Sequence, residues 1–222
     1  IISGLRALQT QVIATTIPNP LDTAYFSNRN TASAILYLDP SVLPQYFPQI
    51  GPNDYLTRNS LMTIANQLEA GPLGTLPDGS ILTAATAQKL TDGINALNAQ
   101  IVNVARANGA VVYDLNAFLH KVKTSGASAG GTALSADYLG GFYSLDSVYP
   151  GPTGNALIAN DFLSFLNSTY KTSFQPVSVS TVAAKDAIVL QIPPKGHLRT
   201  TETLRQIPDR RISIEMLRKE RQ

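Results

Sequence analysis

Cysteine is absent from the 222 residues, and histidine occurs only twice, at His120 and His197. The absence of cysteine excludes disulfide bonds, thiolate nucleophiles and zinc sites of the cysteine type. Two histidines also exclude a histidine-rich metal centre. No apolar run approaches the roughly 18 residues that a membrane-spanning helix needs, so we expect no membrane span. We therefore predict neither a metal nor another cofactor.

A secretory signal peptide is also not recognisable, because no positively charged stretch followed by an apolar core opens the chain. The first residue is Ile1, and the opening phrase "IISGLRALQTQVIATTIP" is typical of a fragment or a processed product. We therefore expect the parent protein to carry further residues before Ile1. A mean hydropathy of +0.01 suits a folded globular body rather than a disordered chain.

Charge is distributed unevenly along the chain, which carries 17 basic and 15 acidic residues. Residues 195–222 hold 8 of the basic and 4 of the acidic residues, so this tail carries +4 and the other 194 residues carry −2. The acidic side chains within the tail dilute any phosphate-binding patch, and we expect no nucleic-acid partner. The sequence thus predicts a body at 1–194 and a basic extension at 195–222.

Two short β-branched runs predict buried parallel strands, at 11–18 ("QVIATTIP") and 110–115 ("AVVYDL"). Between them, the stretch 83–109 predicts an amphipathic helix with one apolar face. That face comprises Leu90, Ile94, Leu97, Ile101 and Val104. Strand, helix and strand in this order indicate a right-handed parallel crossover. Two parallel strands do not form a stable doubly wound sheet, so we expect them to belong to a larger α/β unit.

The remaining stretches give weaker signals. The pattern favours a short helix within 51–71 and a final helix at 153–170, whereas 19–33 and 125–138 are typical of loops. The run 187–193 is expected to form a late strand or an extended segment. In the final helix the buried stripe is expected at Leu157 or Ile158 and at Phe162, Phe165 and Leu166.

Open α/β sheets place their ligands beyond the carboxyl ends of their parallel strands. Two loops qualify here, 18–33 after the first strand and 116–152 after the second. The phrase "SLDSVYPGPTGNALIAN" at 144–160 closes the second loop and leads into the final helix. Aromatic residues gather in this loop, and core packing is the expected role of Tyr138, Phe142, Tyr143 and Tyr149.

The segment 137–167 resembles the last block of the SGNH hydrolases, also called GDSL esterases or lipases. That block usually reads F-S-x-D-G-x-H-P-[ST]-x-x-G-x-x-x-I-A-N. The residues that match it here are Ser144, Asp146, Pro150, Gly154, Ile158, Ala159 and Asn160. Residues 10–26 and 81–119 are similar, in order and spacing, to the family's fourth strand and to the helix and fifth strand that follow it. The resemblance runs from about residue 5 to about residue 190.

The resemblance implies an α/β fold, namely part of a flavodoxin-like three-layer α/β/α sandwich with parallel strands and without its amino-terminal strands. It implies a serine ester hydrolase that acts on carboxylic, lipid or acetyl esters, with a small-molecule ester or acylated substrate as its partner. In such an enzyme a serine attacks the carbonyl, a histidine takes its proton and an aspartate orients the imidazole. It also implies an exported bacterial protein.

The chain departs from the family pattern at the residues that carry the chemistry. Tyr149 occupies the position of the catalytic histidine, and tyrosine, with an ordinary pKa of about 10, is not a base for serine at neutral pH. Asp146 keeps the orienting position without an imidazole to orient, so a hydrogen bond within the loop or at the helix entry is its expected role. Ser147 stands where glycine is usual. Asp146 and Tyr149 are thus the candidate catalytic-site residues of a loop that we expect to be inactive.

The family's nucleophile block, G-D-S, has no counterpart in the chain. A G-x-N-D sequence does occur in "GPNDYL" at 51–56, but it follows the strand at 11–18, whereas the family's block precedes its fourth strand. We therefore expect Asn53 to form a turn rather than an oxyanion hole. His120 is expected at the surface or in packing, and His197 lies in the basic tail.

Three interpretations of function stay open at this point. The first is an SGNH-type ester hydrolase seen here without its amino-terminal part, in which we expect the G-D-S and G-x-N-D blocks, and inactive in this form. The second is a degenerate homologue that binds a carbohydrate or acyl ligand without turnover. The third is a fragment whose sheet edge would favour aggregation or a partner chain. The sequence leaves the substrate and the oligomeric state open.

Overall fold

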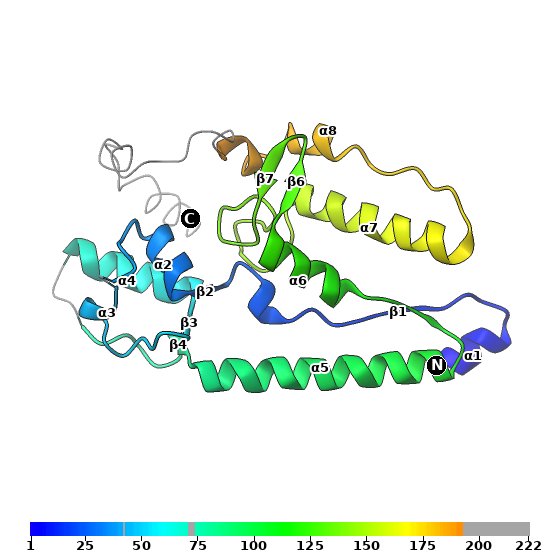
Figure 1. The fold of residues 1–222 in the computed structure, drawn as a ribbon, viewed down its shortest axis with the longest axis horizontal. Helices are drawn as coiled ribbons and strands as arrows, with labels where there is room; N and C mark the ends of the chain where they lie inside the picture. The colour runs from blue at the N-terminus through cyan, green and yellow to red at the C-terminus, as the bar shows by residue number, and fades with distance from the viewer. Residues whose placement is uncertain (42, 71–73, 193–222) are drawn as a thin grey trace. The chain divides into compact units, whose positions relative to one another are not determined.

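The computed structural model describes residues 1–41, 43–70 and 74–192, which adopt a mixed α/β fold (Figure 1). None of the helices in this part of the chain is long and apolar enough to cross a membrane. The basic tail at 195–222 lies outside the described residues. Its separation from the body therefore stays a prediction.

The described residues divide into two compact units. Ile1–Ala24 together with Gln88–Ile192 forms the first unit, and Tyr25–Ala87 belongs to the second. The long helix α5 (Ala84–Ala107) begins in the second unit and continues in the first. Both predicted parallel strands and the loop at 144–152 belong to the first unit.

The two predicted parallel strands are confirmed, although each is short. β1 (Ile13–Thr15) pairs in parallel with β5 (Val111–Tyr113), with Ile13 opposite Val111. Helix α5 lies between them in the chain and supplies the connection that a parallel pair requires. Among the described residues this sheet has two strands. The structure thus shows an α/β fold, and the flavodoxin-like three-layer arrangement stays a prediction.

Helix α5 is confirmed, and its predicted apolar face is buried only in part, since Leu90, Ile94 and Ile101 are half-buried. Leu97 and Val104, which the apolar pattern places on the buried face, are 41% and 56% exposed. The fully buried positions are Ala87, Asn98 and Ala105, whose spacing keeps them on one side of the helix together with Ile94 and Ile101. A polar side chain lies on this buried face, and a search for apolar periodicity does not reveal it.

The final helix, α7 (Pro152–Tyr170), is also confirmed. The buried carboxylate of Asp186 accepts hydrogen bonds from the backbone N–H and the hydroxyl of Thr153, at 3.1 and 2.8 Å, and so caps the helix. Glycine is required at Gly154, since a β-carbon there would overlap the carbonyl oxygen of Phe142. The start of α7 is therefore fixed by two separate contacts.

The segment predicted as a loop at 125–138 contains a β-hairpin. β6 (Ala127–Ala129) pairs antiparallel with β7 (Thr132–Leu134) across Gly130 and Gly131. Both glycines have positive φ, +57° and +90°, which suits a two-residue hairpin turn. The loop prediction is wrong here because the small residues of the two strands hide the Gly-Gly turn signal.

The run at 187–193 is not a late strand. Its described part contains the 3-10 helix η2 (Val189–Gln191), which begins close to a side-chain contact between Asp186 Oδ1 and the backbone N–H of Ile188 at 3.1 Å. Such local hydrogen bonds compete with pairing in a sheet. Other short helices in the first unit are α1 (Ile2–Ala7), η1 (Pro20–Asp22), α6 (Leu115–Ser125) and α8 (Val179–Ala183).

The second unit contains an antiparallel sheet with the strand order β2–β3–β4. Its elements are β2 (Phe26–Asn28), α2 (Arg29–Ile35), α3 (Leu43–Tyr46), β3 (Tyr55–Thr57), α4 (Arg58–Ala70) and β4 (Ile81–Leu82). Its core comprises Ala32, Leu43, Phe47, Ile50, Leu56, Leu61 and Ile64. Burial of each large apolar side chain in this core stabilises the unit by about 1.5–3 kcal/mol.

The sequence predicted this second unit only in part. The short helix within 51–71 is confirmed as α4, and its expected end at Gly71 lies outside the described residues. The loop predicted at 19–33 is interrupted by β2 and by the start of α2. Both elements depend on a strand far along the chain, because β2 pairs with β3.

Candidate functional site

The carboxyl ends of β1 and β5 are joined by side-chain hydrogen bonds. The hydroxyl of Thr16 donates to Asp114 Oδ1 at 2.8 Å and accepts the backbone N–H of Asn116 at 2.9 Å. Asp114 also caps α6 through the backbone N–H of Ala117. The two strands therefore deliver the loops that follow them to neighbouring positions, as expected for a parallel pair.

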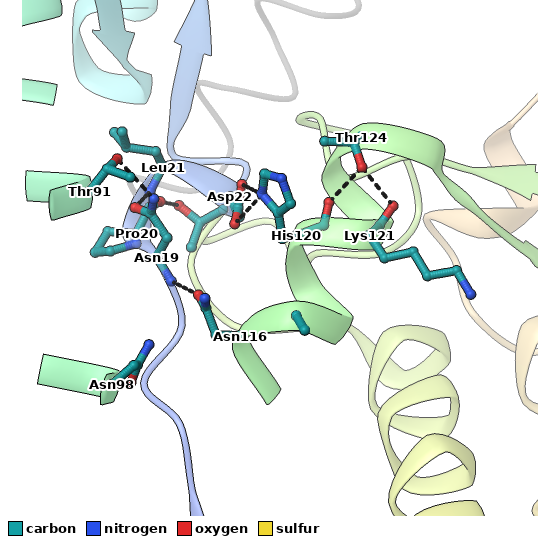
Figure 2. A network of polar contacts seen from close by, with 12 residues as sticks. Asn19, Pro20, Leu21, Asp22, Thr91, Asn98, Asn116, His120, Lys121 and Thr124 are labelled. Atoms are coloured by element: carbon teal, nitrogen blue, oxygen red, sulfur yellow. Dashed lines mark hydrogen bonds and ion pairs between the residues drawn. The ribbon is translucent and has the colours of Figure 1, made fainter. Parts of the chain in front are cut away.

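Asparagine side chains hold the loop after β1 in position (Figure 2). The buried amide of Asn98 donates to the carbonyl of Ile17 at 2.8 Å and accepts the N–H of Ile17 at 2.7 Å, as a neighbouring strand would. The backbone N–H of Asn19 donates to Asn116 Oδ1 at 2.8 Å, and the side chain of Asn19 donates to the hydroxyl of Thr91 at 3.1 Å. This loop is thus fixed to both α5 and α6 where it enters η1.

Asp22, at the end of η1, faces His120 on α6 (Figure 2). The Asp22 side chain is buried, whereas the His120 side chain is 62% exposed. Nδ1 of His120 lies 3.2 Å from each carboxylate oxygen of Asp22. The pair engages Nδ1 and leaves Nε2 as the ring nitrogen for a ligand or for proton exchange. A histidine oriented in this way by a carboxylate has the geometry of an acid–base group.

Burial is the main influence on the carboxyl group of Asp22. It raises the pKa of Asp22 above the ordinary value of 3.8, while the charges of His120 and Lys123 pull that pKa back down. Burial also raises the pKa of the Tyr143 hydroxyl, and the charge of Asp22 raises it further. Tyr143 directly precedes the loop at 144–152. The loops that follow the two parallel strands therefore approach each other around Asp22.

Asp146 has a structural role in the loop at 144–152. Its Oδ1 accepts the backbone N–H groups of Val148 at 2.7 Å and of Tyr149 at 2.9 Å, which is the pattern of an Asx turn. The backbone N–H of Ser144 donates to the carbonyl of Tyr149 at 2.8 Å and closes the turn. The hydrogen-bonding role predicted for Asp146 is therefore present in the structure.

The aromatic residues of this loop differ in how deeply they are buried. Tyr138, Phe142 and Tyr143 are buried, as predicted, and the rings of Phe142 and Tyr143 meet edge to face with their centroids 5.1 Å apart. The core-packing role predicted for Tyr149 is wrong, because Tyr149 is 71% exposed. Tyr149 donates its backbone N–H to Asp146, so the aspartate holds the turn in which Tyr149 lies.

Ser147 occupies a backbone conformation that favours glycine. Its φ is +68°, in the left-handed region where a β-carbon is strained. The residue is fully buried, and its hydroxyl has no hydrogen-bond partner among the described residues. The glycine that the family pattern usually has at this position would avoid both penalties.

The pairing of Asp22 with His120 is the feature of this site that sequence reasoning missed. The two residues are 98 positions apart, and neither belongs to a recognisable motif. A usable signal exists, since each follows the carboxyl end of one predicted parallel strand. The surface position predicted for His120 is confirmed, whereas His197 lies outside the described residues.

No protein-family model, curated protein or solved structure matches the chain. The geometry of the site is therefore the basis for a functional proposal. The site offers an oriented imidazole and a turn-forming aspartate, and no serine hydroxyl in the described part of the chain hydrogen-bonds to the imidazole ring. Within the same ranges, no three histidine or acidic side chains come close enough to hold a metal ion.

Proposed function

We propose that this chain carries the closing block of an SGNH/GDSL-type ester-hydrolase fold with a degenerate catalytic loop. In this proposal the chain does not turn over esters by the serine mechanism. Support comes from the parallel pair of β1 and β5, from α5 between them, and from the order in which the loop at 144–152 leads into α7. The fold-level likeness to an ester hydrolase rests on this order and on the sequence pattern.

One observation carries the proposal of a non-catalytic loop. Oδ1 of Asp146 accepts two backbone N–H groups of its own loop, and Tyr149, which stands in the histidine's place, directs an exposed side chain away from packing. An aspartate that orients a catalytic imidazole accepts the imidazole N–H, and position 149 supplies a tyrosine, which has no such group. The loop therefore keeps its shape without the acid–base pair that a serine nucleophile requires.

Hydrolysis of 4-nitrophenyl acetate tests this proposal. We expect the rate with the wild-type chain to equal the uncatalysed rate, with no saturation at high substrate concentration. Asp146→Ala and its matched control Leu145→Ala, an exposed neighbour in the same loop, should give the same rate as the wild type. A saturable rate that persists in Leu145→Ala but vanishes in Asp146→Ala would show instead that the loop is catalytic.

The substitution Tyr149→His restores the family's histidine, and the same ester assay applied to this variant gives a second test. We expect no turnover from this variant, because the chain contains no G-D-S block to supply the nucleophile. Saturable hydrolysis by Tyr149→His would mean that a serine within the chain serves as the nucleophile. The assignment of the loop to the family's last block would then survive, and the proposed absence of a nucleophile would not.

A further inference from the structure

A polar pocket lies in the second unit, at the ends of β2 and β3. It has a volume of about 310 Å³ and is lined by Asn28, Arg29, Asn30, Pro52, Asn53 and Tyr55. This volume falls at the lower end of the range of about 300–1,000 Å³ that is usual for small-molecule sites. The pocket is separate from the loop at 144–152, which belongs to the first unit.

Hydrogen bonds hold the walls of the pocket in place and leave other polar groups of the lining for a ligand. Asn28 pairs with Tyr55 across the antiparallel strands, and its Oδ1 caps α2 by accepting the N–H of Thr31 at 2.9 Å. The turn that carries Asn53 is fixed by Asp54, whose carboxylate accepts the backbone N–H of Gly51 at 2.9 Å and that of Ala84, at the start of α5, at 2.8 Å. The role of Asn53 in a turn is therefore as predicted, and its side chain lines the pocket.

Arg29 gives the pocket its charge. It is the charged residue of the lining, and no acidic side chain stands with it there. Its Nε is buried and has no hydrogen-bond partner among the described residues. Because Nε is buried, the two terminal nitrogens of the guanidinium are the donors that a ligand in the pocket would meet. A guanidinium group binds a carboxylate through two parallel N–H···O bonds, and the two terminal nitrogens can supply both.

The rest of the lining selects among anions. Three asparagine amides and the Tyr55 phenol can donate to and accept from hydroxyl groups. Such a lining does not favour an acyl chain, which would leave these polar groups without partners. A single guanidinium balances one negative charge, so a dianion such as phosphate would remain partly uncompensated. We propose that this pocket binds a hydroxylated monocarboxylate of the sugar-acid class, with its carboxylate on Arg29 and its hydroxyls on the asparagine amides.

Calorimetric titration with two matched sugars tests the proposal. D-Glucuronate and D-glucose differ in having a carboxylate or a hydroxymethyl group at the same carbon, so the difference in their affinities isolates the carboxylate. We expect glucuronate to bind at least tenfold more tightly than glucose and more tightly than inorganic phosphate. Equal affinities for the two sugars, or tighter binding of phosphate, would overturn the assignment of the ligand class.

Substitutions of residues that line the pocket test whether glucuronate binds there. Arg29→Gln should lower the affinity for glucuronate at least tenfold, and Arg29→Lys should lower it less, because lysine keeps the charge but not the two-pronged donor. The control is Arg106→Gln, which removes an exposed arginine on α5 and should leave the affinity unchanged. Unchanged binding by a folded Arg29→Gln variant would refute the site.

A second variant and a second readout protect this test against misfolding of Arg29→Gln. Asn53 is exposed on a turn, so Asn53→Ala should keep the fold and weaken glucuronate binding several-fold. In an amide NMR titration of the wild type, shifts should concentrate at residues 28–30 and 52–55. Shifts confined to other residues would contradict the proposal. Because this site does not involve the loop at 144–152, its failure would leave the proposed function untouched.

Discussion

At the scale of single residues, the pairing of Asp22 with His120 is a contact whose strength depends on pH. Burial raises the pKa of Asp22, so the folded chain holds the Asp22 proton more tightly than the unfolded chain does. The stabilisation linked to this proton is complete below the ordinary pKa of 3.8 and is lost as the pH rises through the raised pKa. Ionisation of the buried Asp22 therefore lowers the stability of the fold. The contact with His120 offsets part of this loss.

The substitution Asp22→Asn removes this titration. We expect the free energy of unfolding of Asp22→Asn, relative to the wild type, to increase as the pH rises from below 3.8 to above the raised pKa of Asp22. Urea denaturation at a series of pH values measures the trend. In a His120→Gln background, which lacks the imidazole that lowers the pKa of Asp22, the trend should extend to higher pH. Parallel stability curves for Asp22→Asn and the wild type would contradict the account.

Ser147 provides a second prediction at this scale. Its left-handed φ of +68° and its buried hydroxyl without a partner among the described residues both cost stability. We expect Ser147→Gly to stabilise the protein by about 1 kcal/mol, since the strain of a β-carbon in this region is about 1–2 kcal/mol and glycine loses part of the gain to chain entropy. Thermal or urea unfolding measures the change.

Ser147→Ala separates the two contributions, because alanine removes the hydroxyl and keeps the β-carbon. We expect it to stabilise less than Ser147→Gly. If the two variants were equally stable, the orphan hydroxyl and not the backbone conformation would explain the cost of serine at this position.

At the scale of elements, α7 holds the chain that follows it through two asparagines. The side chain of Asn160 bonds to both backbone groups of Val177, at 2.8 and 2.7 Å, and Asn167 does the same with Phe174, at 2.9 and 2.8 Å. The two asparagines lie seven residues apart and therefore on one side of the helix. This arrangement gives Asn160, one of the residues that match the family block, a structural role.

Removing one of these clamps should loosen the segment without unfolding α7. We expect Asn160→Ala to speed hydrogen exchange at the amide of Val177 by about two- to tenfold, as suits the loss of a hydrogen bond worth about 0.5–1.5 kcal/mol. Ser164→Ala, an exposed position on the same helix, serves as the control and should leave this exchange unchanged. Equal exchange in the two variants would show that Asn160 does not hold the segment.

The elements that could be predicted from the sequence are those with a local cause. Helices α5 and α7 follow from periodic apolar residues, and β1 and β5 follow from β-branched runs next to turns. The hairpin of β6 and β7 was missed although Gly130 and Gly131 signal it locally. The burial of Asn98 on α5 was missed because it depends on hydrogen bonds to the backbone of Ile17.

At the scale of the whole molecule, the Asp22–His120 pair was missed because the two residues are distant in the chain. Asp22 meets His120 only because β1 and β5 pair, and no spacing rule connects the two residues. The loop at 144–152 is the opposite case, since Asp146 bonds within its own turn and the motif predicted that contact. The second unit likewise depends on long-range pairing, here of β2 with β3.

Labelling of the full chain with a fluorophosphonate, followed by intact mass and peptide mapping, tests whether the loop at 144–152 takes part in serine catalysis. Such a reagent forms an adduct with a serine only where that serine is activated by a base. We predict that wild type and Tyr149→His both keep the unmodified mass, because the wild-type loop at 144–152 supplies no base and neither chain contains a G-D-S block to supply the nucleophile. A stoichiometric adduct on one serine of the wild-type chain, lost in Asp146→Ala, would contradict the account.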